Sequence, residues 1–241
     1  MDPIAKPLTL WRVMRIRRRL KRGAGFFSEA IGRVMTTLRL DDLRQHSDVL
    51  RARNGAPVTV RFVEPRDAEE LRHYFRSLTQ RSRYNRFLGA TSELSKRLLD
   101  EFVHVGEADR FTVVATIDID GFDTIVGEAR YAFDADTSSI EFGLSIDDRW
   151  QGQGIGKALL KNLECRAAAF GAERLFGDTL RSNDSMIALA RKSGYAFTNS
   201  PGDWKLVRFE KPLDVEPRDI PCASWRLTAA SRQAAQSSVA V

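Results

Sequence analysis

Apolar and polar residues alternate along several stretches of the chain, which predicts strands with one buried face. The clearest stretch has Ile140, Phe142 and Leu144 at every second position. The strands expected from such patterns span residues 58–63, 111–117, 124–133, 139–147, 174–180, 195–199 and 204–210. Apolar residues three or four positions apart predict amphipathic helices over residues 67–78, 92–104, 155–167 and 183–192. Residues 81–87 are expected to form a polar and aromatic link between the first two helices.

The two ends of the chain differ in composition from this patterned region. Residues 1–60 hold 13 Lys and Arg against 5 Asp and Glu, whereas the remaining residues hold 25 against 27. Residues 1–57 are therefore predicted to be a basic, partly helical extension. A chain that starts near Ala56, and so lacks this extension, is expected to fold. The extension is either a solvated tail or a contact for an anionic surface or an acidic partner. Residues 214–241, rich in Ala, Ser, Gln and Pro, are expected to be a mobile tail.

The composition favours a cytoplasmic protein with one domain of ordinary size. The 241 residues are 43% hydrophobic, enough for a packed core, and no apolar run approaches the length of a membrane span. The N-terminus lacks the apolar stretch and the cleavage site of a secretory signal. The two cysteines and three histidines show no metal-ligand spacing, so no metal is expected. The sequence leaves the oligomeric state open.

The stretch with the most specific chemistry follows the strand expected at 139–147 and opens the next helix. It reads Gln151, Gly152, Gln153, Gly154, Ile155, Gly156 and Lys157. A glycine-rich turn in this position exposes backbone N–H groups at the positive end of the helix dipole, which suits a phosphate or pyrophosphate. A Walker A loop is excluded because Ala158 follows Lys157. The glycine spacing also does not fit a dinucleotide-binding fingerprint.

Two segments carry a resemblance to a known family. Gln151, Gly154 and Gly156 match Q/R-x-x-G-x-G/A, which resembles the acetyl-CoA pyrophosphate motif of the GNAT superfamily of N-acetyltransferases. Asn183, with the helical stretch that ends at Gly194, resembles the second conserved region of that family. The chain is therefore identified as a GNAT member, with acetyl-CoA as co-substrate.

The resemblance implies a fold for residues 58–213. In the GNAT fold, an α/β fold of the α+β type, a mixed, mostly antiparallel sheet is flanked by helices. The expected order of elements, β-α-α-β-β-β-α-β-α-β-β, is the order of that fold. Its fourth and fifth strands, here 139–147 and 174–180, are splayed apart and leave a slot for the cofactor.

The resemblance also implies which residues bind the cofactor. The glycine-rich stretch 151–157 would hold the pyrophosphate. The backbone of Leu144, Ser145 and Ile146 would pair with the pantetheine arm, and the N–H of Ile146 would polarise the thioester carbonyl. Asn183 would contact the same arm. Its place at the start of a helix is also that of an N-cap, and the two roles are compatible.

Glu141 is the candidate general base. Its apolar neighbours Ile140 and Phe142 would partly desolvate the carboxylate and raise its pKa toward the working range. The pattern around Glu141 resembles the bacterial Pat-like protein lysine acetyltransferases, in which a Glu at the matching position is the base. The alternative is a paired carboxylate on an exposed face of the sheet. Glu128, on the preceding strand, is a second candidate base.

One position departs from the family pattern. Many GNAT members carry a Tyr that protonates the leaving thiolate, and the matching residue here is Ala190. Water, Tyr131 and Tyr195 remain alternatives for this acid. The predicted function is an N-acetyltransferase that moves an acetyl group directly to an amine, with a protein lysine favoured. The alternatives are a small amine, such as a polyamine or an aminoglycoside-like acceptor, and a non-catalytic acyl-CoA-binding regulatory module.

Overall fold

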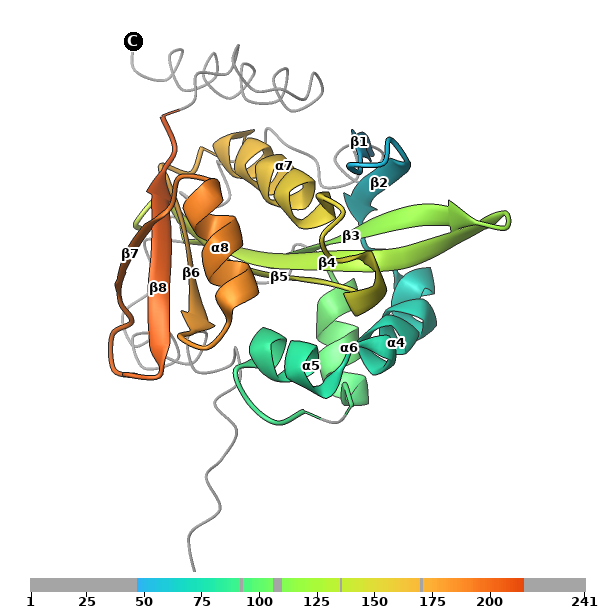
Figure 1. Cartoon of the computed structure of the whole chain (residues 1–241), viewed down its shortest axis with the longest axis horizontal. Helices are drawn as coiled ribbons and strands as arrows, with labels where there is room; N and C mark the ends of the chain where they lie inside the picture. Colours follow the sequence, from blue (N-terminus) through green and yellow to red (C-terminus); the bar gives the residue numbers. More distant parts are fainter. Residues whose placement is uncertain (1–46, 92, 106–109, 135, 170, 215–241) are drawn as a thin grey trace, which may run out of the picture.

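One mixed sheet organises the part of the chain that the computed structural model describes, residues 47–91, 93–105, 110–134, 136–169 and 171–214 (Figure 1). The eight strands lie in the order β1-β2-β3-β4-β5-β6-β8-β7, and all neighbours are antiparallel except β5 and β6. The strands are β1 (Asp48–Arg51), β2 (Pro57–Phe62), β3 (Arg110–Ile119), β4 (Phe122–Asp134), β5 (Ser139–Ile146), β6 (Arg174–Leu180), β7 (Ala196–Asn199) and β8 (Leu206–Pro212). Residues 1–46 of the predicted basic extension and residues 215–241 of the predicted C-terminal tail lie outside the described residues.

Helices cover both faces of the sheet, as Figure 1 shows. On one face lie the 3-10 turn η2 (Pro65–Asp67), α4 (Ala68–Ser77), α5 (Gln80–Phe87) and α6 (Lys96–Val103). On the other face lie α7 (Ile155–Ala169) and α8 (Asp184–Lys192), and the 3-10 turn η4 (Asp148–Trp150) leads into α7. Within the described ranges, no helix is long and apolar enough to cross a membrane.

The helices form where the sequence supplies both a cap and an apolar face. In α4, Leu71, Tyr74 and Phe75 are buried, which is the spacing of one helical face. The Ser95 side chain accepts a hydrogen bond from the Leu98 N–H and so caps the start of α6. The predicted helices and strands are thus present, with boundaries that differ from the expected ones by a few residues.

The splay expected between the fourth and fifth strands is confirmed at β5 and β6. These strands pair only where Ser139, Ile140 and Glu141 meet residues 174–176, and β5 then continues to Ile146 without β6 as a neighbour. Gly177 stands at the end of the paired region. A Cβ there would lie 2.7 Å from the Phe142 carbonyl oxygen, so only glycine lets the strands run this close before they diverge.

The prediction that residues 81–87 form a link is wrong, because these residues form most of helix α5. Thr79 caps this helix, and its side chain accepts a hydrogen bond from the Ser82 N–H. Its buried residues are Arg86 and Phe87. The inward face of α5 thus carries a charged residue, and hydrophobic periodicity could not reveal it.

The predicted boundary at residue 57 needs a correction, because the sheet begins at β1. This edge strand pairs antiparallel with β2. The Asp48 carboxylate accepts a hydrogen bond from Asn162 at 2.6 Å and one from Arg166 at 3.2 Å, both on α7. A four-residue strand of sequence DVLR has too little alternation to be recognised in the sequence.

A chain that begins at Ala56 should therefore be less stable than one that begins at Ser47. It lacks β1 and leaves Arg166, whose side chain is fully buried, without the Asp48 carboxylate. The expected loss in the free energy of unfolding is about 3 kcal/mol, as for other buried ion pairs that lose one partner. Urea denaturation of both chains measures it, and Asp48→Asn in the longer chain should reproduce part of the loss. Equal midpoints would show that β1 is dispensable.

Candidate active site

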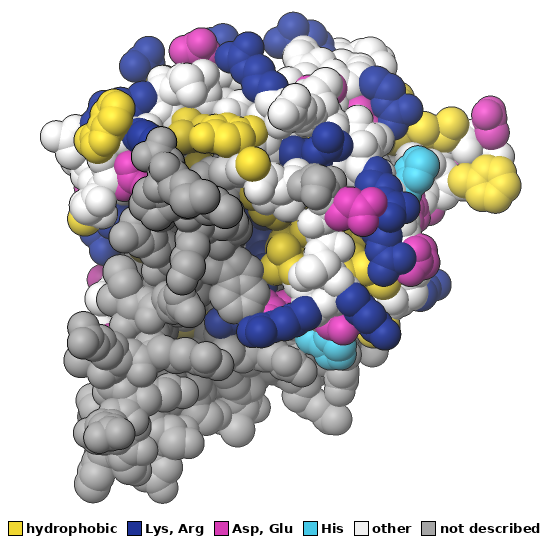
Figure 2. Space-filling view, turned by 90° about the horizontal axis from the view of Figure 1, so that it is seen from below, with side chains coloured by type: hydrophobic (Ala, Val, Ile, Leu, Met, Phe, Trp, Pro, Cys, Tyr) yellow, Lys and Arg dark blue, Asp and Glu magenta, His cyan; other side chains and the backbone are white. Residues whose placement is uncertain are grey.

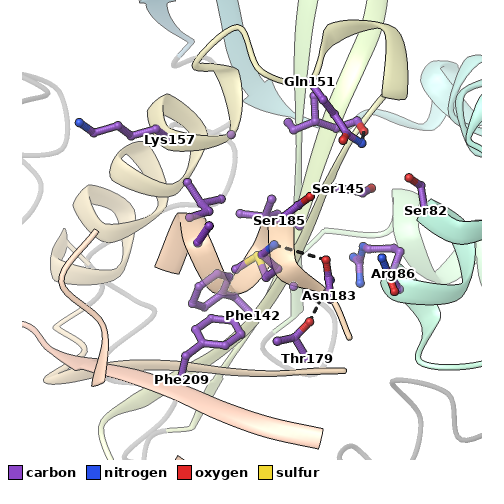
Figure 3. Close-up of a pocket in the computed structure, with 18 of the residues that line it drawn as sticks. Ser82, Arg86, Phe142, Ser145, Gln151, Lys157, Thr179, Asn183, Ser185 and Phe209 are labelled. Atoms are coloured by element: carbon purple, nitrogen blue, oxygen red, sulfur yellow. Dashed lines mark hydrogen bonds between the residues drawn. The ribbon is translucent and has the colours of Figure 1, made fainter. Parts of the chain in front are cut away.

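A cavity of about 660 Å³ lies where β5 and β6 separate. Residues of β5, β6, α5, α8 and the glycine-rich turn line it, and Figure 3 shows side chains from these elements around one space. All the predicted site residues line the cavity except Gln153 and Ile155. The predicted motif and the predicted base, which lie apart on the chain, therefore share one cavity.

The glycine-rich turn has the backbone shape that its sequence predicts. Gly152 and Gly154 have φ angles of +75° and +87°, which residues with a side chain rarely adopt. Helix α7 begins at Ile155, so the turn places its backbone at the positive end of this helix. Lys157, in the first turn of α7, lines the edge of the cavity, and its side chain extends away from the other labelled side chains (Figure 3).

The turn is fixed to its surroundings by polar contacts. The Gln151 amide donates to the Ile146 carbonyl at 3.0 Å, which ties the turn to the end of β5. The Arg53 N–H donates to the Gln153 carbonyl at 2.6 Å, which ties it to the loop after β1. Asp148 accepts hydrogen bonds from the Thr79 backbone, at 2.8 Å, and from the Thr79 and Ser82 hydroxyls. The turn and α5 are therefore held in a fixed relation.

Asp147 anchors the end of β5. Burial alone would raise the pKa of this carboxyl group, but hydrogen bonds from the Arg149 side chain and backbone and from Ser77 outweigh it and lower the pKa. Arg149 contributes two side-chain hydrogen bonds, at 3.0 and 2.7 Å. A carboxylate held in this way stays ionised at neutral pH and fixes the strand from which the turn departs.

The register of β5 shows which backbone groups face the cavity. The Asp147 N–H donates to the Val126 carbonyl of β4 at 2.9 Å, and Ile146 lies opposite Gly127. Because hydrogen-bonded and non-hydrogen-bonded pairs alternate in an antiparallel ladder, the N–H and C=O groups of Leu144 and Ile146 point away from β4. They point toward the opening that β6 leaves. By the same alternation, Ser145 turns its backbone groups to β4.

The prediction that the Ser145 backbone pairs with the pantetheine arm therefore needs a correction, because its N–H and C=O groups point to β4. Its side chain instead belongs to a buried network on the α4–α6 face of the sheet. The Ser145 hydroxyl donates to Glu128 at 2.7 Å and lies 2.9 Å from the Tyr74 hydroxyl. Burial, and next the Glu128 charge, raise the pKa of Tyr74 well above its usual value.

Glu128, the second candidate base, lies at the centre of this network. Arg86 of α5 binds both of its carboxylate oxygens, one of them from Nη2 at 2.9 Å. Burial lowers the pKa of Arg86, but the charge of Glu128 and the hydrogen bonds to it raise the pKa more. Glu128 is fully buried and does not line the cavity. Its contacts are those of a structural ion pair.

Glu141 is half-buried on β5 and lines the cavity. The neighbouring strands β6 and β8 carry an ion pair, in which Arg208 of β8 donates to both oxygens of Asp178 of β6 at 3.1 and 2.7 Å. The hydrogen bonds to Asp178 raise the pKa of Arg208, and the charges of Asp178 and Glu141 raise it further. Asp178 also lines the cavity, so two carboxylates face the same space.

Asn183 acts as the N-cap of α8. Its side-chain oxygen accepts a hydrogen bond from the Met186 N–H at 3.3 Å, and its amide donates to the Thr179 hydroxyl at 2.9 Å (Figure 3). The N-cap role is therefore confirmed. Asn183 also lines the cavity, and contact with a cofactor arm stays a prediction.

Of the two tyrosines considered as general acids, Tyr131 lines the cavity and Tyr195 does not. Burial raises the pKa of Tyr195 far above its usual value, and the residue does not line the cavity. The Tyr131 ring stacks on Phe111, with centroids 5.3 Å apart, and burial raises its pKa as well. Ala190 is fully buried and offers no proton.

Several cavity residues carry no motif and were missed in the sequence. They are Arg53, Arg86, Arg130 and Asp178. Their places follow from strand pairing and from α5, neither of which a local pattern reveals. Across the described ranges, no group of three or more His, Cys, Asp or Glu residues is arranged to hold a metal ion.

A mixed sheet that splays beside a glycine-rich turn and a helix N-terminus offers a slot with a phosphate-binding end. The sequence model of the acetyltransferase (GNAT) family matches residues 70–195, slightly more than half of the 241-residue chain. The chain therefore belongs to this family of acetyltransferases, which transfer an acetyl group to an amine.

Relatives agree with this assignment. The acetyltransferase PA5475 of Pseudomonas aeruginosa is 28% identical over 150 residues, covering 62% of this chain and 81% of that protein. The GNAT domain of S. lividans PAT is 26% identical with a TM-score of 0.64, covering 69% of this chain and 97% of that domain. Spermidine N-acetyltransferase from Vibrio cholerae, solved with CoA and spermine, has a TM-score of 0.54 at 14% identity, covering 65% of this chain and 95% of that one. This last likeness concerns the fold alone.

Proposed function

We propose that this acetyltransferase moves the acetyl group of acetyl-CoA directly onto the side-chain amine of a protein lysine, with Glu141 as the general base. The observation that carries the proposal is that one cavity joins the glycine-rich turn, the open edge of β5 and Glu141. Donor and acceptor can therefore meet beside a carboxylate within one cavity.

The donor side of the cavity suits acetyl-CoA. The proposed pyrophosphate ligands are the backbone N–H groups of residues 151–157, at the start of α7. The open edge at Leu144 and Ile146 would pair with the pantetheine arm as it would with an added strand. The N–H of Ile146 would then polarise the thioester carbonyl, and Asn183 would line the same arm.

The acceptor amine needs a base. A lysine amine has a pKa near 10.4, so neutralising it at pH 7 costs about 4.6 kcal/mol. Glu141 would take that proton as the amine nitrogen attacks the thioester carbon and the carbon–sulfur bond breaks. In this proposal water protonates the leaving thiolate, because Ala190 supplies no acid at the position where many relatives have a tyrosine.

The preference for a protein lysine rests on the resemblance of the sequence around Glu141 to the Pat-like enzymes. The similarity to the GNAT domain of S. lividans PAT, which covers 97% of that domain, supports it. A polyamine is the second candidate acceptor. Its support is weaker, because the spermidine N-acetyltransferase shares only 14% identity with this chain.

An acceptor assay tests the proposal. The full chain is incubated with acetyl-CoA and either a lysine-containing peptide or spermidine, and free thiol and acetylated product are measured. We expect acetyl-lysine, with a kcat/KM for the peptide roughly tenfold or more above that for spermidine. Acetylation of spermidine alone would favour the second candidate. Binding of acetyl-CoA without transfer to any amine would contradict both.

A further inference from the structure

Arg130 of β4 is a buried cation without a matched partner. Its residue is 3% exposed, and its Nε and Nη2 atoms have no hydrogen-bond partner. The guanidinium lies 4.4 Å from the centre of the Phe102 ring on α6. This ring contact compensates only part of the lost hydration, because a buried charge normally needs an opposite charge as well.

Two carboxylates, Glu101 and Glu128, lie near enough for their charges to act on Arg130, but each already pairs with another arginine. Glu128 is bound by Arg86 through both oxygens. Glu101 pairs with Arg97 at 3.2 Å and lies 3.9 Å from Arg110. In the part of the chain that the structure describes, no carboxylate forms a hydrogen bond with Arg130. Burial, and next the charges of Arg86 and Arg110, lower the pKa of Arg130 to about 10.

This arginine differs from those on the surface of the same face. Figure 2 shows lysine and arginine side chains beside acidic ones there, exposed to water. Arg76, for example, is exposed and pairs with Glu93 at 2.9 Å. Water and salt screen such charges. Arg130 is buried and lines the cavity, so an anion bound in the cavity can reach it.

Strand register places Arg130 close to the proposed base. Arg130 lies opposite Gly143, and Glu141 lies opposite Ala132, so Arg130 and Glu141 share one face of the sheet. Diagonal neighbours in an antiparallel pair have Cβ atoms about 7–8 Å apart. Gly143 has no side chain to cover the guanidinium. A molecule whose amine approaches Glu141 could therefore reach Arg130 with a second group.

We propose that Arg130 binds a carboxylate of the acceptor, and that the acceptor is therefore an amine that also carries an acidic group. This inference rests on the proposed function, in which the amine lies at Glu141. A carboxylate that accepts two hydrogen bonds from a guanidinium forms one of the stronger polar contacts in proteins. It would supply both the missing charge and the missing hydrogen-bond acceptors.

The carboxylate has two possible sources, and two pairs of acceptors separate them. The first pair is Nα-acetyl-lysine and its C-terminal amide, which differ only in the backbone carboxylate. The second is a lysine peptide with a neighbouring Glu and the same peptide with Gln, both with blocked ends. We expect the acid in one pair to have a kcat/KM about 10- to 100-fold above its neutral partner, as for hydrogen bonds to a charged group.

Arg130→Met tests whether this arginine causes the preference. Methionine keeps an unbranched apolar side chain against Phe102 and removes the charge. The variant should lose the preference, so that the acid and the neutral acceptor of a pair have the same kcat/KM, and it should keep its affinity for acetyl-CoA. It should also be at least as stable as the parent, because an unpaired buried charge is removed. Arg130→Lys should restore part of the preference, and Arg76→Met is the surface control.

Three results would overturn the inference. They are equal use of acid and neutral acceptors by the parent, an equal fall in kcat/KM for both acceptors in Arg130→Met, and a loss of acetyl-CoA affinity in that variant with its preference intact. Absence of transfer to every acceptor would instead overturn the proposed function, and the inference with it. Transfer to all acceptors at equal rates would leave the proposed function standing and refute only the role of Arg130.

Discussion

Replacement of Glu141 by glutamine should lower turnover at pH 7 by roughly 10²–10⁴-fold, the range found for a positioned acid or base. Glutamine keeps the shape of the side chain and cannot take a proton. The affinity for acetyl-CoA should stay nearly unchanged, because the proposed pyrophosphate ligands lie on the glycine-rich turn and not on Glu141. Steady-state turnover and calorimetric titration with acetyl-CoA measure the two quantities.

The pH profile separates a base from a residue that only shapes the cavity. As the pH rises toward the amine pKa near 10.4, more of the acceptor is already neutral and less depends on a base. The deficit of Glu141→Gln should therefore shrink with rising pH. Asp178→Asn is the matched control, because Asp178 is a carboxylate of the same cavity held by Arg208, and its effect should be similar at every pH. Unchanged turnover of Glu141→Gln at pH 7 would exclude it as the base.

Much of the fold could be predicted because most elements have a simple periodicity. The strand at β5 alternates, and the helices α4 and α7 carry apolar residues on one face. Two elements lack this signal. Helix α5 buries a charged residue, Arg86, and β1 is a short polar edge strand. Both are specified by contacts with distant segments, Glu128 in one case and α7 in the other.

Some residues of the candidate site could likewise be predicted from a local sequence pattern, and others could not. The glycine-rich turn and Asn183 were recognisable because the chemistry of each depends on residues that are adjacent in sequence. The orientation of Ser145 depends on which residue of β4 lies opposite it, and a shift of one position would reverse it. Arg130 and Asp178 enter the cavity only because strands from different parts of the chain are neighbours. No local pattern contains that information.

The buried pair of Arg86 and Glu128 leads to the second large prediction. Arg86→Met should lower the free energy of unfolding by about 3–5 kcal/mol, because it removes the two hydrogen bonds and the paired charge that hold a buried carboxylate. The Arg86 and Glu128 side chains are 2% and 0% exposed, so water cannot replace the lost partner. Urea denaturation of the parent and the variant at neutral pH gives the difference.

A double variant decides whether Glu128 is structural or a base. Arg86→Met with Glu128→Leu removes both charges and should recover part of the stability lost in the single variant, since an apolar pair of similar size can replace a buried ion pair. The coupling between the two positions should be large, as it is for groups in direct contact. If Glu128 were the base instead, Glu128→Gln would lower turnover most at low pH while stability hardly changed. We expect the opposite: a marked loss of stability, and a loss of turnover that does not depend on pH.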